Sequence, residues 1–260
     1  GKELTQPMDL YRMDLHIHTV LSPCAELDMG APDIISRCRE EDIDLIAITD
    51  HNSALNCEAL NRASTGSGVE VICGLEVQSS EDIHVLCLMP DLEKARAFEE
   101  WVRKRLPPYR NIPDKFGDQF VIDEDNHVID EYEILLVQGI DATADEIIEK
   151  TRSFGGLSIL AHIDRPAYSY VAVLGMIPEN LEVDAVELSG RLTGSEALFW
   201  LEKAGKRSVI RSSDAHTLKD IGQERTTMAL LGKPSFHELS LALKGVDGRK
   251  VLWPWDRNSP

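Results

Sequence analysis

The sequence predicts an α/β fold with a largely parallel sheet. Strand-like segments alternate with segments of helical periodicity about seven times, which is typical of βα units and favours a closed barrel over an open sheet. The length of 260 residues suits one large domain, alone or with a small accessory lobe. A hydrophobic content of 43% is that of a globular chain.

Runs rich in Val, Ile and Leu mark the strands. The strand candidates are Met13–His18, Leu45–Thr49, Val69–Cys73, Ile83–Met89, Leu157–His162, Ala185–Ser189 and Ser208–Ser212. The helix candidates lie between them and are Pro32–Glu41, Asn56–Ala63, Asp91–Leu106, Thr143–Phe154, Ser195–Ala204 and Ser235–Lys244. Pro32 near a helix start and Gly205 directly after a helix end are residues usual at these positions.

Residues 107–141 interrupt the alternation. The stretch PPYRNIP is followed by acidic turns in IDEDNHVIDEYE without a helical period. Loops this long are commonly functional lids or disordered segments. We therefore predict a barrel domain over residues 8–250, interrupted by a cap or lid lobe at 107–141, with terminal segments at 1–7 and 251–260.

The net charge of −18 limits the expected partners. Duplex binding depends on Lys and Arg that neutralise successive phosphates, so an acidic surface disfavours long nucleic acid. A small phosphorylated ligand is compatible with it, because a bound metal can reverse the local field. The expected partner is a small phosphorylated substrate and no long nucleic acid, and the composition does not indicate an oligomeric state.

The apolar runs are short. Leu45–Ile48 is representative, and such runs fall far below the ~20 residues that span a bilayer. No secretory signal pattern precedes them. The five cysteines are an odd number in a chain too large to depend on disulfides. We expect a cytoplasmic protein with no membrane partner.

Two histidines stand at the end of the first predicted strand, in MDLHIHTVLSPC. Met13, Leu15 and Ile17 alternate with polar residues, so a period of two directs His16 and His18 to one face. Imidazole is the commonest metal ligand, but it is also a common hydrogen-bonded core group. This pair alone leaves both interpretations open.

Other candidate ligands recur near later strand ends. They are Asp50, His51, Glu76, His84, His162, Asp214 and His216. Singly, each has an ordinary explanation as a surface carboxylate, a helix cap or a core histidine. In a barrel, the carboxyl ends of the strands converge on one face. Six imidazoles and three carboxylates crowded there need a compensating cation, so the pattern predicts a polynuclear metal site.

The ligand types narrow the metal and the chemistry. Mixed imidazole and carboxylate donors suit zinc, manganese or iron better than calcium or magnesium. A carboxylate such as Glu76 can bridge two ions, and paired ions clamp the attacking and leaving oxygens of a hydrolytic displacement. The expected reaction is phosphoester hydrolysis.

The order HxH, TDH, a Glu after the third strand, an isolated His, AH and SSDAH resembles the PHP (polymerase and histidinol phosphatase) family of metal-dependent phosphoesterases. The resemblance runs from Asp14 to about Gly245 and implies a distorted (β/α)7 TIM-like barrel with two or three divalent metal ions. It assigns one metal to His16, His18, Glu76 and Asp214, a second to Glu76, His84 and His162, and a third to His51 and His216.

One position departs from the family pattern. Family members often place a His or Asp shortly after HxH, where this chain has Pro23 and Cys24. Cys24 is either a substitute ligand, as a zinc-binding thiolate, or a buried thiol. Asp50 is expected to hydrogen-bond to a ligand instead of binding metal itself.

The resemblance implies a metal-bridged hydroxide that attacks phosphorus, with Glu76, Asp214 and His216 as the catalytic residues. Arg165 and Arg191 follow strand ends and are positioned to bind phosphate through a bidentate fork. Either is alternatively an ordinary surface salt-bridge partner.

The expected function is hydrolysis of small phosphomonoesters, such as a nucleotide or a sugar or amino-alcohol phosphate. Two alternatives stay open. One is exonuclease-like cleavage at oligonucleotide ends, and the other is a non-catalytic regulatory module that binds metals.

Overall fold

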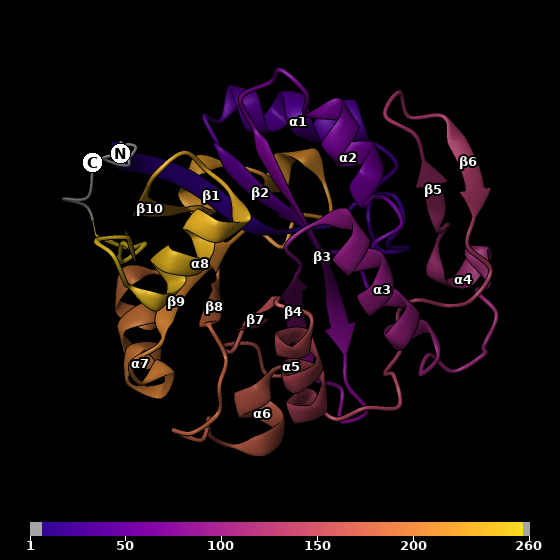
Figure 1. The fold of residues 1–260 in the computed structure, drawn as a ribbon. Coiled ribbons are helices and arrows are strands. Elements are labelled where there is room, and N and C mark those ends of the chain that lie inside the picture. Colours follow the sequence, from indigo (N-terminus) through magenta and orange to yellow (C-terminus); the bar gives the residue numbers. More distant parts are fainter. Residues whose placement is uncertain (1–6, 257–260) are drawn as a thin grey trace.

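A nine-stranded sheet curls into a nearly closed barrel in the computed structural model, which describes residues 7–256 (Figure 1). The strands follow the order β11-β10-β1-β2-β3-β4-β7-β8-β9. Their bounds are β1 Asp9–Ile17, β2 Leu45–Ile48, β3 Glu70–Gln78, β4 His84–Leu88, β7 Leu157–Leu160, β8 Ala185–Ser189, β9 Ser208–Ser212, β10 Thr227–Leu231 and β11 Lys250–Val251. The predicted barrel is confirmed. Most of the predicted terminal segment 1–7, and residues 257–260, lie outside the described part.

The sheet is less parallel than predicted. Strands β1, β2 and β3 are parallel, as are β7, β8 and β9. Strand β4, however, is antiparallel to both β3 and β7, and β10 is antiparallel to β1. The connection from β3 to β4 is too short for a crossover helix, so these two strands form a hairpin. Strands β10 and β11 were not predicted.

The barrel closes where the end of β1 meets the segment after β9. Ile17 forms a parallel bridge with Ala215. The amide of His18 donates to the carbonyl of Ala215 at 3.0 Å, and the amide of Ala215 donates to the carbonyl of His16 at 3.3 Å. These bonds place the polar segment after β9 directly beside the HxH motif.

An apolar cluster fills the barrel at the end from which the parallel strands start. It includes Met13, Leu45, Leu157 and Ala185 from four strands. Helix α8 (Phe236–Lys244) adds Leu239, Ala242 and Leu243 to this cluster. Helix α8 thus closes this end of the barrel, and the hydroxyl of Ser208, the first residue of β9, donates to the carbonyl of Leu243 at 2.7 Å. The polar strand ends lie at the opposite end of the barrel.

A bulge in β1 changes the predicted alternation. Asp14 pairs with Ile46 and Ile17 pairs with Ile48, so β1 has one extra residue between these pairs. Leu15 belongs to the inner apolar cluster, whereas Ile17 belongs to the outer one. Bulges commonly redirect a side chain beside a functional site, and this one turns His16 toward the barrel interior.

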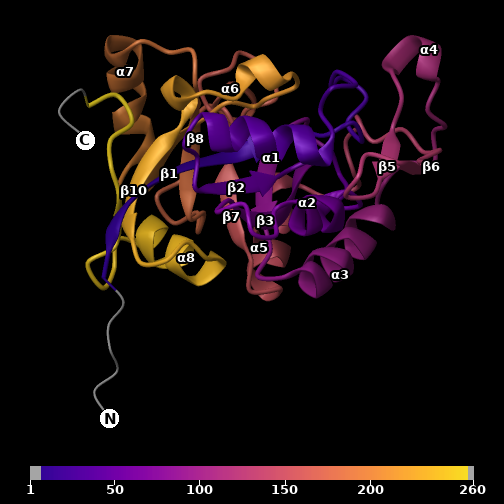
Figure 2. The ribbon, with the colours of Figure 1, turned by 90° about the horizontal axis from the view of Figure 1, so that it is seen from above.

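The remaining helices surround the strands (Figures 1 and 2). They are α1 Ala31–Glu40, α2 Cys57–Ala63, α3 Leu92–Arg103, α5 Ala144–Ser153, α6 Tyr170–Leu174 and α7 Gly194–Ala204. Their buried residues, such as Ile34 of α1 and Phe98 of α3, pack on the outer face of the sheet. Side-chain caps set several starts, including those by Asp91 on α3 and Thr193 on α7. No helix among residues 7–256 is long and apolar enough to cross a membrane.

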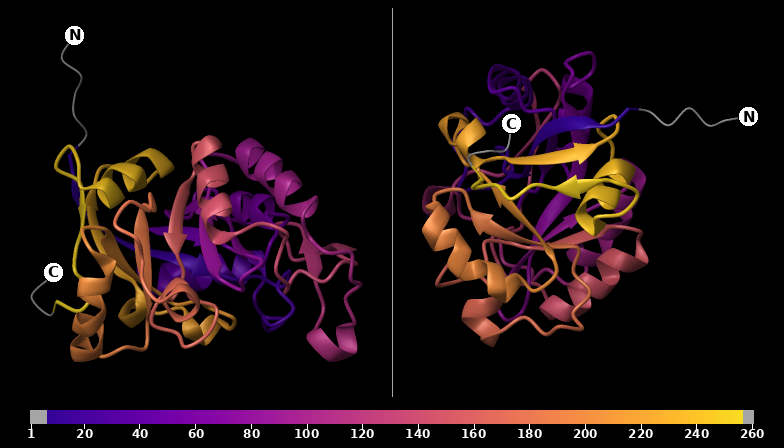
Figure 3. Two further views of the ribbon diagram at one scale, coloured as in Figure 1. Left: turned by 90° about the horizontal axis from the view of Figure 1, so that it is seen from below. Right: turned by 90° about the vertical axis from the view of Figure 1, so that its left-hand side faces the viewer.

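Residues 107–141 form a small lobe beside the barrel, on the side away from α7 (Figure 3). The lobe contains α4 Pro113–Phe116 and a hairpin of β5 Phe120–Ile122 and β6 Val128–Glu131. The amide of Phe120 donates to the carbonyl of Val20 at 3.0 Å. The lobe therefore packs on the segment that follows the HxH motif. Its role as a lid stays a prediction.

Candidate metal centre

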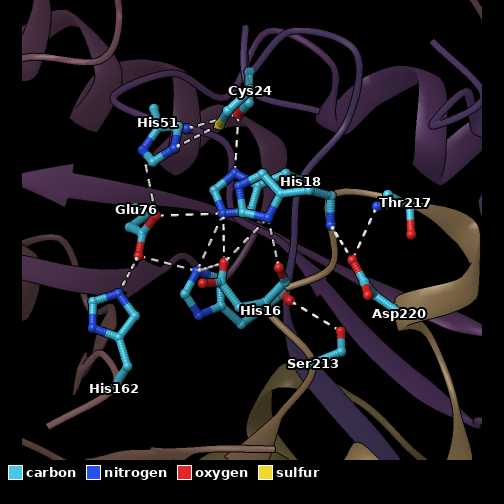
Figure 4. A network of polar contacts seen from close by, with 12 residues as sticks. His16, His18, Cys24, His51, Glu76, His162, Ser213, Thr217 and Asp220 are labelled. Carbon is cyan, nitrogen blue, oxygen red and sulfur yellow. Dashed lines mark hydrogen bonds and ion pairs between the residues drawn. The ribbon is translucent and has the colours of Figure 1, made fainter. Parts of the chain in front are cut away.

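A cavity of about 550 Å³ opens among the polar strand ends. Its walls include His51, Glu76, His84, His162, Asp214 and His216. His16 and His18 are fully buried and contact two of these lining residues, Glu76 and Asp214. The structure thus brings all eight expected metal ligands together. Figure 4 shows His16, His18, His51, Glu76 and His162 from close by. His84 differs from the other ligands, because it is the first residue of its strand. Strand β4 runs antiparallel to β3 and β7, so its start lies beside the cavity.

One group of ligands consists of His16, His18, Glu76 and Asp214. Nε2 of His16 lies 3.0 Å from Glu76 Oε2 and 3.0 Å from Asp214 Oδ1. Nε2 of His18 lies 3.0 Å from the same Asp214 oxygen. Four donor atoms therefore converge on one point, with the residue combination that the resemblance implied for the first metal.

A second group consists of Glu76, His84 and His162. Nδ1 of His84 lies 3.2 Å and Nε2 of His162 lies 3.4 Å from Oε2 of Glu76. Among the described residues, both ring nitrogens of His84 and His162 and Oε2 of Glu76 are buried without a hydrogen-bond partner. Buried polar atoms are rarely left unpaired, so a bound cation would supply the partner that these atoms lack.

The third group is His18, His51 and His216, so His18 joins the pair that the resemblance implied. Sγ of Cys24 lies 3.4 Å from Nε2 of His51. Cys24 is an exposed residue, which argues against the alternative of a buried thiol. Desolvation of its sulfur beside the centre and the charge of nearby Glu76 raise the pKa of the thiol to about 12. The structure places Cys24 beside this group, and its role as a ligand stays a prediction.

A divalent cation fits each group. The candidate ligand atoms of each group lie within 4.8 Å of one another. Atoms bound about 2 Å from a common ion are necessarily about 3 to 4 Å apart, which matches the 3.0 Å and 3.4 Å contacts to Glu76. Imidazole and carboxylate donors without hydrogen-bond partners are the chemistry expected of a transition-metal site.

The charges of the centre depend on one another. Burial lowers the pKa of His18, but hydrogen bonds to the nearby carboxylates raise it overall to about 9. Burial opposes the charge of Glu76, but the neighbouring imidazoles hold the pKa of its carboxyl well below the usual range. Burial and the charge of His18 lower the pKa of His51, and lower that of His216 to about 4. Burial likewise opposes the charge of Asp214, but nearby imidazoles lower the pKa of its carboxyl, so the two carboxylates of the first ligand group favour the ionised form that metal binding requires.

The other predicted residues are near the centre but differ in role. Asp50 does not face the cavity; it accepts hydrogen bonds from the amide and hydroxyl of Thr19 and the hydroxyl of Ser22, each at 2.7 Å. Arg165 and Arg191 both line the cavity. Arg165 Nη1 lies 3.6 Å from Asp214 Oδ2, and Arg191 is largely exposed. Both guanidinium groups are accessible to a bound phosphate.

Three further residues at the centre were not predicted from the sequence. Glu187, on β8, contacts Nδ1 of His16. Ser22 contacts Nδ1 of His18 at 3.0 Å. The ring of Tyr168 stacks on His84 with centroids 4.9 Å apart, and it lines the cavity. The one available signal was for Glu187, a charged residue inside the apolar strand AVELS.

The PHP domain family model matches residues 14–169, which is more than half of the chain. The chain belongs to the PHP family. The expected membership is therefore confirmed. YqxK, an uncharacterized protein of Bacillus subtilis, is 30% identical over 178 residues, which are 66% of this chain and 39% of YqxK.

Solved structures share this PHP fold. The lesion-specific endonuclease PfuEndoQ of Pyrococcus furiosus has a TM-score of 0.66 at 20% identity, covering 94% of this chain and 58% of that one. A putative metal-dependent phosphoesterase of Bifidobacterium adolescentis has a TM-score of 0.55 at 18% identity, covering 78% and 87%. The chain thus spans less than two thirds of YqxK and of PfuEndoQ.

A further comparison corrects the expected partner. Endonuclease Q in complex with a 27-mer duplex carrying an abasic lesion has a TM-score of 0.63 at 19% identity, covering 93% of this chain and 58% of that one. The expectation of a small phosphorylated substrate without long nucleic acid is wrong on this finding. Net charge sums the whole surface, whereas binding depends on the local field at the site.

Proposed function

We propose that this PHP-family chain is a metal-dependent phosphodiesterase that cleaves the backbone of nucleic acids. The observation that carries the proposal is the sharing of Glu76 between two groups of candidate ligands at one cavity, which Arg165 and Arg191 also line. A shared carboxylate holds two cations close together, and paired cations suit displacement at phosphorus.

The ligand groups would hold two or three ions of zinc, manganese or iron. His16, His18, Glu76 and Asp214 would hold one, Glu76, His84 and His162 a second, and His18, His51 and His216 a third. When bound, such ions polarise phosphoryl oxygens and lower the pKa of water. We assign catalytic contact to Glu76, Asp214 and His216, because all three line the cavity.

The chain's own residues would orient the phosphodiester. Asp214 and His216 have partly exposed side chains, 26% and 29%, so they face the substrate more than buried Glu76 does. Arg165 and Arg191 would bind the non-bridging oxygens by charge-assisted hydrogen bonds. The cavity, about 550 Å³, is the size of a small-molecule site, so it would admit a nucleotide-sized part of the substrate while the rest lies outside.

The likeness in fold to endonuclease Q supports internal cleavage of a strand. One observation favours a second candidate, the trimming of strand ends. The lobe carries a dense acidic stretch, with Asp123, Glu124 and Asp125 at the hairpin turn, and these charges would repel a strand that extends over the lobe.

Oligonucleotide cleavage distinguishes the two candidates. The purified chain, loaded separately with zinc, manganese or iron, is incubated with an internally labelled duplex, with and without an abasic site, and with end-labelled single strands. Internal cleavage gives intermediate lengths at once, whereas end trimming releases mononucleotides first. The matched control is Glu76→Gln, which keeps the size of the side chain and removes its charge. Hydrolysis of mononucleotides without any cleavage of oligonucleotides would contradict the proposal.

A further inference from the structure

Glu187 is a buried carboxylate that contacts two parts of the candidate metal centre. Its side chain is 2% exposed, and both of its oxygens lie 3.0 Å from Nδ1 of His16. One of these oxygens, Oε1, also accepts a hydrogen bond from the backbone amide of His162 at 2.9 Å. His16 and His162 belong to different ligand groups, which otherwise share Glu76.

Hydrogen-bond chemistry fixes the tautomer of the neutral His16 ring. An ionised carboxylate only accepts hydrogen bonds, so the His16 atom that faces Glu187 carries the hydrogen. In the neutral ring, the lone pair is then on Nε2, the atom that lies 3.0 Å from both Glu76 and Asp214. A carboxylate behind a ligating histidine commonly sets its tautomer and ring orientation in this way.

The contact with His162 acts on the backbone. His162 has φ of +29°, a positive value that residues other than glycine rarely adopt. Oε1 of Glu187 holds its amide, and the carbonyl of Glu187 accepts the next amide, that of Ile163, at 2.9 Å. These two bonds hold the strained turn after β7 against β8, and the turn directs the His162 ring toward Glu76.

We propose that Glu187 is a positioning residue that prepares both Glu76-sharing metal groups at once, through the ring of His16 in one and the backbone of His162 in the other. This inference rests on the metal centre of the proposed function. It does not depend on which phosphodiester is cleaved.

His18 provides an internal contrast, because a separate chain of hydrogen bonds positions it. The Ser22 hydroxyl donates its single hydrogen to Asp50 at 2.7 Å, so its oxygen accepts from Nδ1 of His18 at 3.0 Å. No hydrogen bond of Ser22 or Asp50 to His84 or His162 is present among residues 7–256. Changes at Ser22 should therefore leave the group of Glu76, His84 and His162 intact.

Zinc affinity tests the inference without any measurement of activity. Four variants are titrated with zinc against a chromophoric chelator: Glu187→Ala, Glu187→Gln, Ser22→Ala and Asp184→Asn. Asp184 is the matched control, because it also accepts a backbone amide, that of Ser158 at 2.9 Å, but directly before the opposite end of β8. Loss of a partner behind a ligand typically weakens metal binding about 10- to 100-fold.

We expect Glu187→Ala to weaken two zinc equivalents at least about tenfold each. Glu187→Gln should rescue most of that loss, because an amide oxygen in place of Oε1 can accept from both His16 and His162. Ser22→Ala should spare one of the two equivalents, and Asp184→Asn should spare both. Unchanged binding in Glu187→Ala, or loss of only one equivalent, would overturn the inference.

A spectroscopic readout covers the case in which Glu187→Ala does not fold. In the zinc-loaded parent chain, the imidazole ¹⁵N spectrum should show His16 protonated at Nδ1 and bound to zinc through Nε2. Zinc bound at Nδ1 would refute the role of Glu187. Failure of the parent chain to bind zinc, manganese or iron would refute the metal centre itself. Metal binding without oligonucleotide cleavage would refute only the proposed substrate.

Discussion

At the scale of single residues, Glu76 has the largest number of partners in the centre. Its two oxygens lie within 3.4 Å of ring nitrogens from five histidines, namely His16, His18, His51, His84 and His162. A side chain that is 2% exposed gains this many partners only when several strands end around it. Its charge therefore affects every ligand group, including the one to which it does not belong.

This position predicts an unequal effect of two substitutions. Glu76→Gln should lower metal content and reduce hydrolysis about 100-fold or more, because one neutral amide replaces the charge shared by two ligand groups. Cys24→Ser should lower activity less than about tenfold, because within residues 7–256 the Cys24 thiol makes a polar contact with one ligand, His51, at the edge of the centre. Metal analysis and hydrolysis rates of both variants measure the difference. Equal losses would contradict the shared role of Glu76.

The residues that could be predicted from the sequence are those next to a strand end. His51, His162 and His216 follow apolar runs, and the convergence of strand ends in a barrel brings them together. Glu187 could not be assigned a partner, because His16 is 171 residues away and no spacing connects them. The bulge in β1 could not be predicted from the sequence either, because it depends on the register between β1 and β2.

At the scale of elements, strand direction sets the limit of the prediction. Gln78, the last residue of β3, pairs with His84, the first residue of β4. The hairpin thus brings His84 to the same face as the ends of the parallel strands, although it starts its own strand. An apolar run does not encode direction, so the convergence of strand ends placed His84 in the centre without revealing that its strand runs the opposite way.

The lobe is attached to the barrel through the hairpin turn, which predicts a local effect of Asn126→Ala. Oδ1 of Asn126 accepts from the amide of Ala31, at the start of α1, at 2.7 Å, and Nδ2 donates to Asp33 at 2.8 Å. Asn126 also has φ of +67°, which asparagine tolerates better than alanine. We expect a loss of about 1 to 2 kcal/mol in attachment and faster amide hydrogen exchange in β5 and β6.

The matched control for this substitution is Asp125→Ala, which changes the exposed neighbour in the same turn. Its hydrogen exchange in β5 and β6 should equal that of the parent chain, and metal content should be unchanged in both variants. Exchange that rises equally across the barrel strands would show that Asn126 stabilises the whole fold, contrary to the prediction.

At the scale of the whole molecule, the barrel holds a dense set of charges that bound metal would compensate. Each of the three ligand groups draws residues from several strands; His18, Glu76 and Asp214, for example, come from the ends of β1, β3 and β9. A cation at these residues connects distant parts of the sheet. Because the folded state alone brings them together, metal binding contributes to folding stability.

Metal removal should therefore lower the melting temperature. At a free zinc concentration 100 times Kd, one site adds about 2.7 kcal/mol. For a domain of this size, this corresponds to about 5 to 10 °C per site. Differential scanning calorimetry with zinc and with a chelator measures the shift, and Glu76→Gln should reduce it. An unchanged melting temperature in saturating zinc would contradict binding to the folded barrel.

The net charge of −18, together with the small number of basic residues at the cavity, predicts that nucleic-acid binding depends only weakly on salt. Arg165 and Arg191 are the two basic residues that line the cavity, so few phosphates would be neutralised by side chains. Two such contacts give a slope of about −2 for log K against log salt, or roughly a tenfold loss of affinity between 50 and 200 mM. Fluorescence anisotropy with a labelled duplex and chelator-treated protein measures this slope without cleavage. Arg191→Gln should reduce its magnitude by about one. A slope steeper than about −5 would instead require an extended basic surface outside the cavity.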